Sequence, residues 1–250
     1  MFFKTRSQFT EGDFAFIAET LKTSAPDGST AGLRSPDDLE NVTEMLHDRR
    51  LFERSITTPP LFLTVSPQLY FYLFIYRALD SKNLADDDVV DYVAGVCVEF
   101  RSSDQLWSFA SAAGEKIMTM VDMLNMLPEV GKAEQYYLRR YIGNVSLFLT
   151  GFFPDFIFQR SQQKGAPPLT YYERIGRAQY ETAASGSEEY ESGVRPVLSI
   201  LADEFVAVRS ALNIFTDNYL NLHNDKYALR RIERQAATLD DESFQQSLLH

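Results

Sequence analysis

The chain of 250 residues holds one cysteine and three histidines, and this scarcity restricts its chemistry. Cys97 cannot form an intrachain disulfide, and its apolar neighbours in VAGVCVEF predict a buried, unreactive thiol. A chain without disulfides suits a reducing compartment, so we expect a cytoplasmic protein. The patterns CxxC, HExxH, GxxxxGK[ST], GxGxxG and GxSxG are all missing. The standard motifs of zinc, nucleotide and serine-hydrolase sites are therefore excluded, and we predict no cofactor.

Basic runs are also lacking, and the formal net charge is -11. A general nucleic-acid surface needs clustered lysine and arginine to neutralise phosphates, so we expect no general nucleic-acid binding. The N-terminal MFFKTRSQF has no sustained apolar core, and we expect no secretory signal.

Long apolar runs are limited to two segments, Leu61–Tyr76 and Ile142–Phe158. Each is shorter than the roughly 20 residues that cross a bilayer. Polar residues and prolines interrupt both, among them Pro154 and Asp155 in the second. We expect buried core helices, and conditional membrane insertion is the alternative.

What the sequence does contain is apolar spacing of three and four residues, which is typical of helices, while alternation of strand type is scarce. Thr10 and the pair Ser66-Pro67 provide helix start signals. The pattern predicts a single all-α domain over 1–250, a multi-helix bundle of about nine helices. Gly143 and Gly151 share one helix face and predict the close approach of another helix.

Several breaks divide this pattern. Pro154 should end or kink its helix. The segment Arg160–Leu169 reads as a loop and a point of subdivision, and Thr170 as the cap of the next helix. Ser185-Gly186-Ser187 should break that helix, and 240–250 should form a flexible tail.

The strongest periodic signal predicts a long central helix near 194–222. Its apolar residues follow alternating steps of three and four, as in the a and d positions of a coiled coil. They are Leu198, Leu201, Phe205, Val208, Leu212, Phe215, Tyr219 and Leu222. This seam predicts either the core of a bundle or the interface of a homodimer.

One histidine has the spacing of a metal ligand. Glu40, Glu44 and His47 share a helix face, and Glu44 with His47 forms the Glu-x-x-His found in di-iron bundles. Those sites use a second such motif, which this chain lacks. A solvated helix face is therefore the favoured interpretation, and a bound metal ion the alternative.

Tyrosine and arginine gather on both sides of the Arg160–Leu169 loop. Together these side chains can hold an anionic ligand or form the centre of a protein interface, although they also occur as solvated residues at a bundle end. The candidate binding residues are Tyr137, Arg140, Tyr141, Arg160, Tyr171, Tyr172, Arg174 and Arg177.

Taken together, the sequence predicts a non-catalytic interaction or regulatory protein that binds a protein partner or a second copy of itself. The alternatives are an enzyme that depends on a small ligand or a metal, with its site between helices, and a membrane-inserting protein.

Overall fold

The computed structural model describes residues 4–22, 39–58, 63–100, 119–191 and 193–220, and all regular structure within them is helical. The predicted all-α class is thus confirmed. The first elements are η1 (Thr5–Gln8), α1 (Glu11–Lys22), α2 (Leu39–Leu46), α3 (Arg49–Thr57), α4 (Pro67–Asp80), α5 (Asp87–Phe100) and α7 (Met120–Met126). They are followed by α8 (Lys132–Phe152), α9 (Pro154–Lys164), α10 (Leu169–Tyr190), α11 (Arg195–Asp203), α12 (Phe205–Phe215) and the π-helix η4 (Thr216–Leu220).

The start signals read from the sequence cap real helices. The backbone N–H of Asp13 donates to Thr10 Oγ1 at 3.3 Å, and Asp13 Oδ2 accepts the N–H of Thr10 at 2.7 Å. At the start of α4, Leu69 N–H donates to Ser66 Oγ at 3.2 Å. The other carboxylate oxygen of Asp13 accepts the N–H of Ser66 at 2.7 Å, so the starts of α1 and α4 are held together.

The bounds of the predicted loop and the predicted start of the following helix both differ from those in the structure. The helix α9 continues through Lys164, which restricts the expected Arg160–Leu169 loop to 165–168. Gly165 ends α9 with a φ of 61°, in the left-handed region that favours glycine. Because α10 begins at Leu169 after Pro168, Thr170 is not its cap.

The predicted break at Ser185-Gly186-Ser187 is wrong, because α10 runs on to Tyr190. A glycine inside a helix costs only about 1 kcal/mol relative to alanine. Burial of Ala183, Ala184 and Ser187 against the core outweighs that cost. The predicted tail at 240–250 lies outside the described residues.

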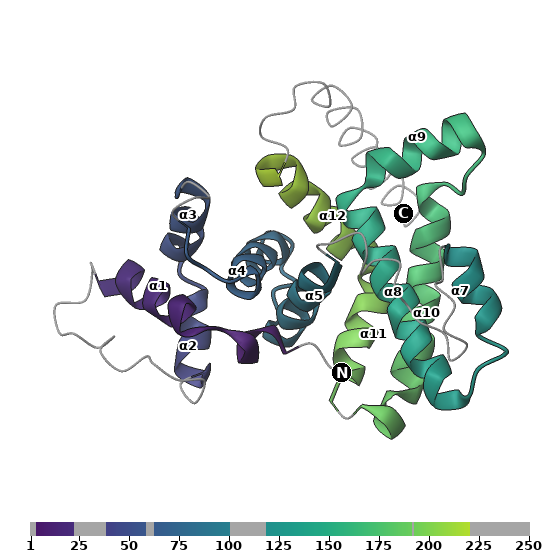
Figure 1. The fold of residues 1–250 in the computed structure, drawn as a ribbon, viewed down its shortest axis with the longest axis horizontal. Helices are drawn as coiled ribbons and strands as arrows, with labels where there is room; N and C mark the ends of the chain where they lie inside the picture. The colour runs from purple at the N-terminus through teal and green to yellow at the C-terminus, as the bar shows by residue number, and fades with distance from the viewer. Residues whose placement is uncertain (1–3, 23–38, 59–62, 101–118, 192, 221–250) are drawn as a thin grey trace, which may run out of the picture.

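The centre of the C-terminal half is the packing of α8 against α10 and α12 (Figure 1). A Cβ atom added at Gly143 would lie 2.6 Å from the ring of Tyr180, and one at Gly151 would lie 2.8 Å from Leu212. These glycines therefore permit the close approach that their spacing predicts. Between them, Asn144 Oδ1 accepts hydrogen bonds from Tyr92 at 2.8 Å and Tyr180 at 3.0 Å.

The segment expected to form one long helix near 194–222 consists of α11 and α12, which meet at Glu204. The two halves have different neighbours, since α11 packs on α10 and α5 whereas α12 packs on α8 and α4. The seam residues from Leu198 to Phe215 are buried in these contacts within one chain. These seam residues thus belong to the core of the bundle, while Tyr219 is half-buried and Leu222 lies outside the described residues.

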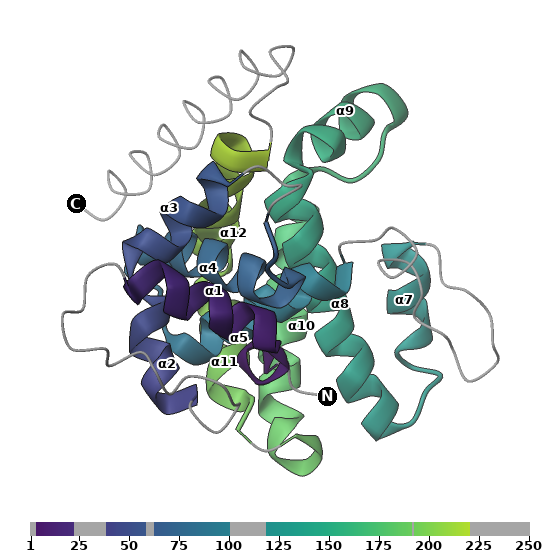
Figure 2. The same ribbon diagram turned by 60° about the vertical axis from the view of Figure 1, so that its left-hand side comes forward.

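In the part of the chain that the structure describes, the two apolar segments belong to α4 and to the pair α8 and α9. There, no single helix is long and apolar enough to cross a bilayer. The pair α8 and α9 passes the same test of length and composition together, but it is bent by 91°. Figure 2 shows α9 projecting at the edge of the molecule, and this helix contacts α8 and α10.

Candidate functional site

The tyrosine and arginine residues do not meet in one place. One group lies where the start of α8 meets the end of α10. Arg140 is buried there, forms an ion pair with Glu191 and lies 5.5 Å from the ring centre of Tyr137. Tyr136 donates to the same carboxylate at 3.1 Å, and burial together with Glu191 raises its pKa. This group joins two helix ends.

A second group lies at the other end of α10. Tyr171 lies 19 helical steps, or about 28 Å, from the end of α10 at Tyr190. Arg160 lies over the ring of Phe156 at 5.4 Å, and Arg177 Nε donates to the carbonyl of Ala202 at 3.2 Å. Three further candidates complete the set: Tyr172 packs edge-on against Tyr171, Tyr141 packs edge-on against Phe100, and Arg174 is exposed.

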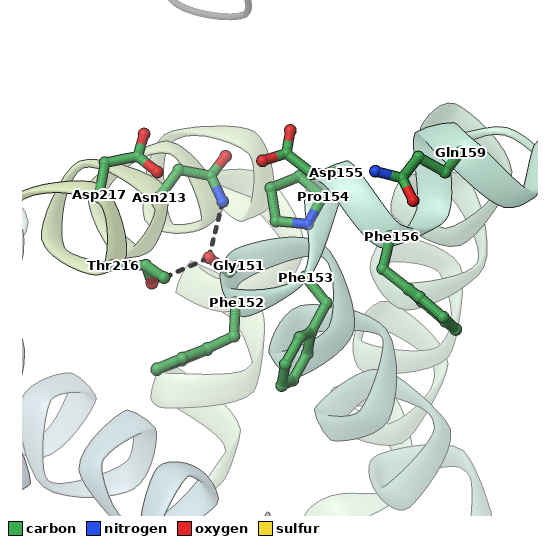
Figure 3. Close-up of a pocket in the computed structure, with 10 residues that line it drawn as sticks. All are labelled: Gly151, Phe152, Phe153, Pro154, Asp155, Phe156, Gln159, Asn213, Thr216 and Asp217. Atoms are coloured by element: carbon green, nitrogen blue, oxygen red, sulfur yellow. Dashed lines mark hydrogen bonds between the residues drawn. The ribbon is translucent and has the colours of Figure 1, made fainter. Parts of the chain in front are cut away.

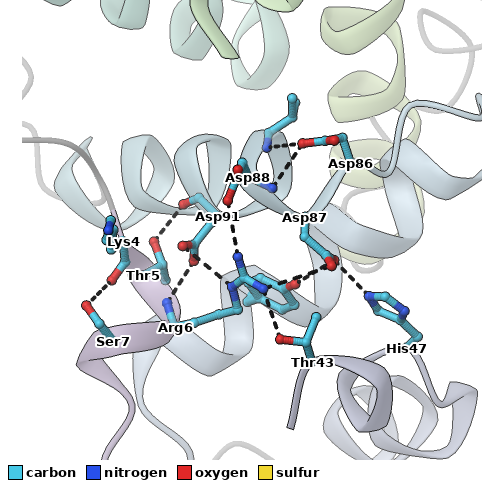
Figure 4. Close-up of polar contacts among 12 residues, drawn as sticks. Lys4, Thr5, Arg6, Ser7, Thr43, His47, Asp86, Asp87, Asp88 and Asp91 are labelled. Carbon is cyan, nitrogen blue, oxygen red and sulfur yellow. Dashed lines mark hydrogen bonds and ion pairs between the residues drawn. The ribbon is translucent and has the colours of Figure 1, made fainter. Parts of the chain in front are cut away.

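The histidine candidate takes part in a polar cluster between η1, α2 and α5 (Figure 4). His47 Nε2 lies 2.9 Å from Asp87 Oδ1, and its ring stacks on Tyr76 at 4.1 Å. Glu44 is exposed, and the side chain of Glu40 lies outside the described part of the chain. Among the described residues, no three His, Cys, Asp or Glu side chains are close enough together to hold a metal ion.

The same cluster fastens the N-terminal segment to α5. The backbone N–H of Arg6 donates to Asp91 Oδ1 at 2.7 Å, and its guanidinium lies 3.6 Å from Asp91 Oδ2 and 3.5 Å from Asp88. Burial raises the pKa of Asp91, and the contacts with Arg6 oppose that rise. Because Arg6 already provides a cation to these carboxylates, the cluster has a structural role, which is to hold η1 against α5.

A different site lies at the elbow, which we define as the bend between α8 and α9 at Pro154. Proline has no N–H and cannot continue the helical hydrogen bonds. The side-chain amide of Asn213 replaces these bonds, donating to the carbonyl of Thr150 at 2.9 Å and to the carbonyl of Gly151 at 2.7 Å. Figure 3 shows the hydrogen bond to Gly151. Asn213 Oδ1 in turn accepts from Arg209 at 2.7 Å.

This support continues into the core, because Arg209 forms a buried ion pair with Glu173 of α10 at 2.8 Å. Thr216 adds a longer hydrogen bond, 3.4 Å, to the carbonyl of Gly151. Three helices, α8, α10 and α12, therefore fix the geometry of the elbow through side chains that are themselves held in place. Such a supported site keeps its shape when something binds to it.

A pocket of about 210 Å³ opens at the elbow. Its only charged lining residues among those the structure describes are Asp155 and Asp217, which lie on either side of Asn213 (Figure 3). Phenyl rings occupy the opposite side. The described residues that line the pocket are Gly151, Phe152, Phe153, Pro154, Asp155, Phe156, Gln159, Asn213, Thr216 and Asp217.

The elbow also exposes large apolar side chains. Phe153, Phe156 and Phe158 are 45%, 52% and 61% exposed. The other large hydrophobic side chains that are exposed in the described ranges, Ile56, Val121, Tyr137 and Val206, lie on four different helices. Three exposed phenylalanines within six residues are a local concentration that packing among the described residues does not explain. We call the pocket together with these three side chains the elbow surface.

No protein-family model, curated protein or solved structure matches this chain. Sequence reasoning located the bend at Pro154 and noted Asp155, but it did not bring Asn213 or Asp217 to the same place. The one available signal was a carboxylate and a proline inside an otherwise apolar segment.

Proposed function

We propose that this chain is a non-catalytic interaction or regulatory protein, acting in a reducing compartment, that binds a protein partner through the elbow surface. The observation that carries the proposal is the exposure of Phe153, Phe156 and Phe158 around a supported pocket. Exposed aromatic side chains beside a pocket are typical of the energetic centre of protein interfaces. The pocket is also smaller than the roughly 300–1,000 Å³ of sites for small molecules.

The position of each phenylalanine extends this surface around α9. Residues two apart on a helix point about 200° away from each other, so Phe156 and Phe158 project to different sides. Ile157, between them, is buried against the body of the protein. A partner that covers both rings would therefore contact α9 on two sides and not on one flat face.

The test is photo-crosslinking in cells from benzoyl-phenylalanine placed at Phe156 or Phe158. Val121 of α7 and Val206 of α12 are matched controls, since both are exposed apolar residues distant in the sequence from the elbow. We expect one common adduct from the two elbow positions and not from the controls. The purified partner should then bind the double variant Phe156→Ser/Phe158→Ser at least tenfold more weakly than the original chain.

Other outcomes distinguish the alternatives. An adduct with a second copy of the chain, with a dimer seen in light scattering, would make self-association the function of the elbow. Sedimentation with vesicles containing phosphatidylserine would replace the protein partner by a membrane. Equal labelling of elbow and control positions would refute a dedicated surface. The metal-dependent enzyme remains a separate hypothesis, tested by metal analysis of the native protein.

A further inference from the structure

We propose that Arg160, beside the elbow surface, binds an acidic side chain of the partner, which presents an apolar segment containing aspartate or glutamate. This inference rests on the proposed function of the elbow surface and names the chemistry of what binds there. Its first support is an unused cation in a chain of net charge -11. Among the arginines of the described ranges, only Arg160 and Arg174 have a guanidinium that forms neither a hydrogen bond nor an ion pair.

The second support is the place where Arg160 is held. Its guanidinium carbon lies 5.4 Å from the ring centre of Phe156, four residues earlier in α9. That ring is exposed, and Figure 3 shows it directed away from Asp155 and Asp217. The ring attracts the cation and keeps water from one side of it, which strengthens the attraction of the guanidinium for an anion. Arg160 is therefore already positioned beside an exposed ring, on the side away from the acidic residues of the pocket.

A second donor lies near this cation. Tyr172 is half-buried, and its hydroxyl forms no hydrogen bond in the part of the chain that the structure describes. Burial raises the pKa of Tyr172, and the positive charge of Arg160 opposes that rise, so the two groups lie within electrostatic reach of each other. The two oxygens of a carboxylate can accept from the guanidinium fork and from this hydroxyl at the same time.

The same features disfavour other occupants. Anionic membranes and nucleic acids attract clusters of several basic residues, whereas this chain is strongly acidic and Asp155 and Asp217 line the neighbouring pocket. A flat bilayer would also not cover both Phe156 and Phe158, which project to different sides of α9. A single carboxylate on an apolar segment pairs with the guanidinium and brings little further negative charge. The partner's segment thus combines aspartate or glutamate with apolar residues.

The experiment uses the full chain labelled with ¹⁵N and two blocked peptides. One is acetyl-Ala-Leu-Glu-Leu-Ala-amide, and the other is its neutral counterpart with glutamine in place of glutamate. We expect saturable shifts of the Nε–H signal of Arg160 and of the amide signal of Phe156 with the glutamate peptide. That peptide should bind at least tenfold more tightly than the glutamine peptide, because only its carboxylate forms charge-assisted hydrogen bonds.

Variants separate the position of the charge from charge alone. Arg160→Gln should weaken binding of the glutamate peptide at least tenfold, and Tyr172→Phe should weaken it by a smaller factor. Arg174→Gln is the matched control, because Arg174 is also exposed and unpaired but projects about 200° away from Tyr172 on α10. This control should bind as the original chain does. Both arginine variants should unfold at the same urea concentration as that chain.

Equal binding of the two peptides, unchanged binding by Arg160→Gln, or an equal loss in Arg174→Gln would overturn the inference. So would inorganic phosphate that displaces the glutamate peptide at a lower concentration than acetate does, or sedimentation with phosphatidylserine vesicles that Arg160→Gln abolishes. A dimer that Arg160→Gln separates would make a second copy the occupant and overturn an external partner. If crosslinking from Phe156 identifies a partner but neither peptide binds, the proposed function stands and this inference fails. If Phe156 gives no specific adduct, the function itself fails.

Discussion

The helices α8 and α9 are separated by one residue and both carry large apolar side chains, yet most of these side chains lie in opposite environments. Every residue of α8 from Ile142 to Gly151 is buried, because α10 and α12 lie along it. In α9, Phe156 and Phe158 are exposed whereas Ile157 is buried, since the bend of 91° leaves only one side of this helix against its neighbours, among them α10. An apolar side chain is thus buried only where another element packs over it. The position of Pro154 sets where this packing along α8 ends.

The largest expected effect compares the same substitution on both sides of this divide. Phe205 is fully buried, and Phe205→Ala should destabilise the fold by about 3–5 kcal/mol. Phe158→Ala should change the free energy of unfolding by less than about 0.5 kcal/mol, because the side chain is exposed. Urea unfolding measures both. Similar losses in the two variants would mean that α9 is covered in solution.

The next test uses the buried tyrosines of the core. The aromatic residues that line the elbow pocket are phenylalanines, which have no group that titrates. Burial raises the pKa of both Tyr92 and Tyr180. Because the folded pKa lies above the unfolded value of about 10, this contribution is complete below about pH 10 and is lost as pH rises further. By pH 11 the loss should approach about 1.4 kcal/mol for each tyrosine.

Urea midpoints between pH 8 and pH 11 measure this loss. The variants Tyr92→Phe and Tyr180→Phe start from lower stability at pH 8, because each gives up the hydrogen bond to Asn144. Above pH 10, however, each should lose less stability than the original chain. A slope that does not change in either variant would show that these phenols are not sealed in the core.

An effect of similar size is expected at the boundary between the two regions. Asn213→Ala removes the donor to the carbonyls of Thr150 and Gly151, and should cost about 2 kcal/mol. Hydrogen exchange should become faster around 150–156, where the elbow loses its support. Asn218→Ala, at an exposed position of η4, is the matched control and should change little. Equal effects of the two variants would contradict a role of Asn213 in fixing the bend.

The smallest effects come from two helical glycines with opposite surroundings. At Gly143 a methyl group would lie 2.6 Å from Tyr180, so Gly143→Ala should destabilise by about 1–2 kcal/mol. At Gly186 no atom lies within 4 Å of the added Cβ atom, so Gly186→Ala should stabilise by about 0.5–1 kcal/mol through helix propensity. Thermal unfolding should show midpoints that move in opposite directions.

The sequence was informative wherever the signal is local. Thr10, Ser66 and Pro154 mark real helix boundaries because capping and the missing N–H of proline act within one turn. It was misleading at Gly186, where burial of neighbouring residues outweighs a weak local preference. The helix α3 was not foreseen, although Asp48 accepts the N–H of Arg50 and so caps it.

The candidate site was less predictable, for a physical reason. Spacing shows that Leu198 to Phe215 share a face, but the same spacing describes a core and a dimer interface. The exposure of Phe156 depends on where α10 and α12 lie, and Asn213 reaches the elbow from a position about sixty residues later in the chain. Such meetings are tertiary, and a single sequence does not contain a local signal for them.

The buried Cys97 gives the core a reporter of its own. It is the single cysteine of the chain, it is almost fully enclosed, and burial raises the pKa of its thiol. A thiol reagent in solution can modify it only during the moments when α5 parts from its neighbours, so the rate of labelling counts those openings. A cysteine introduced at an exposed position of the elbow would react without such an opening. The labelling rate of Cys97 relative to that cysteine would then measure how often the core opens.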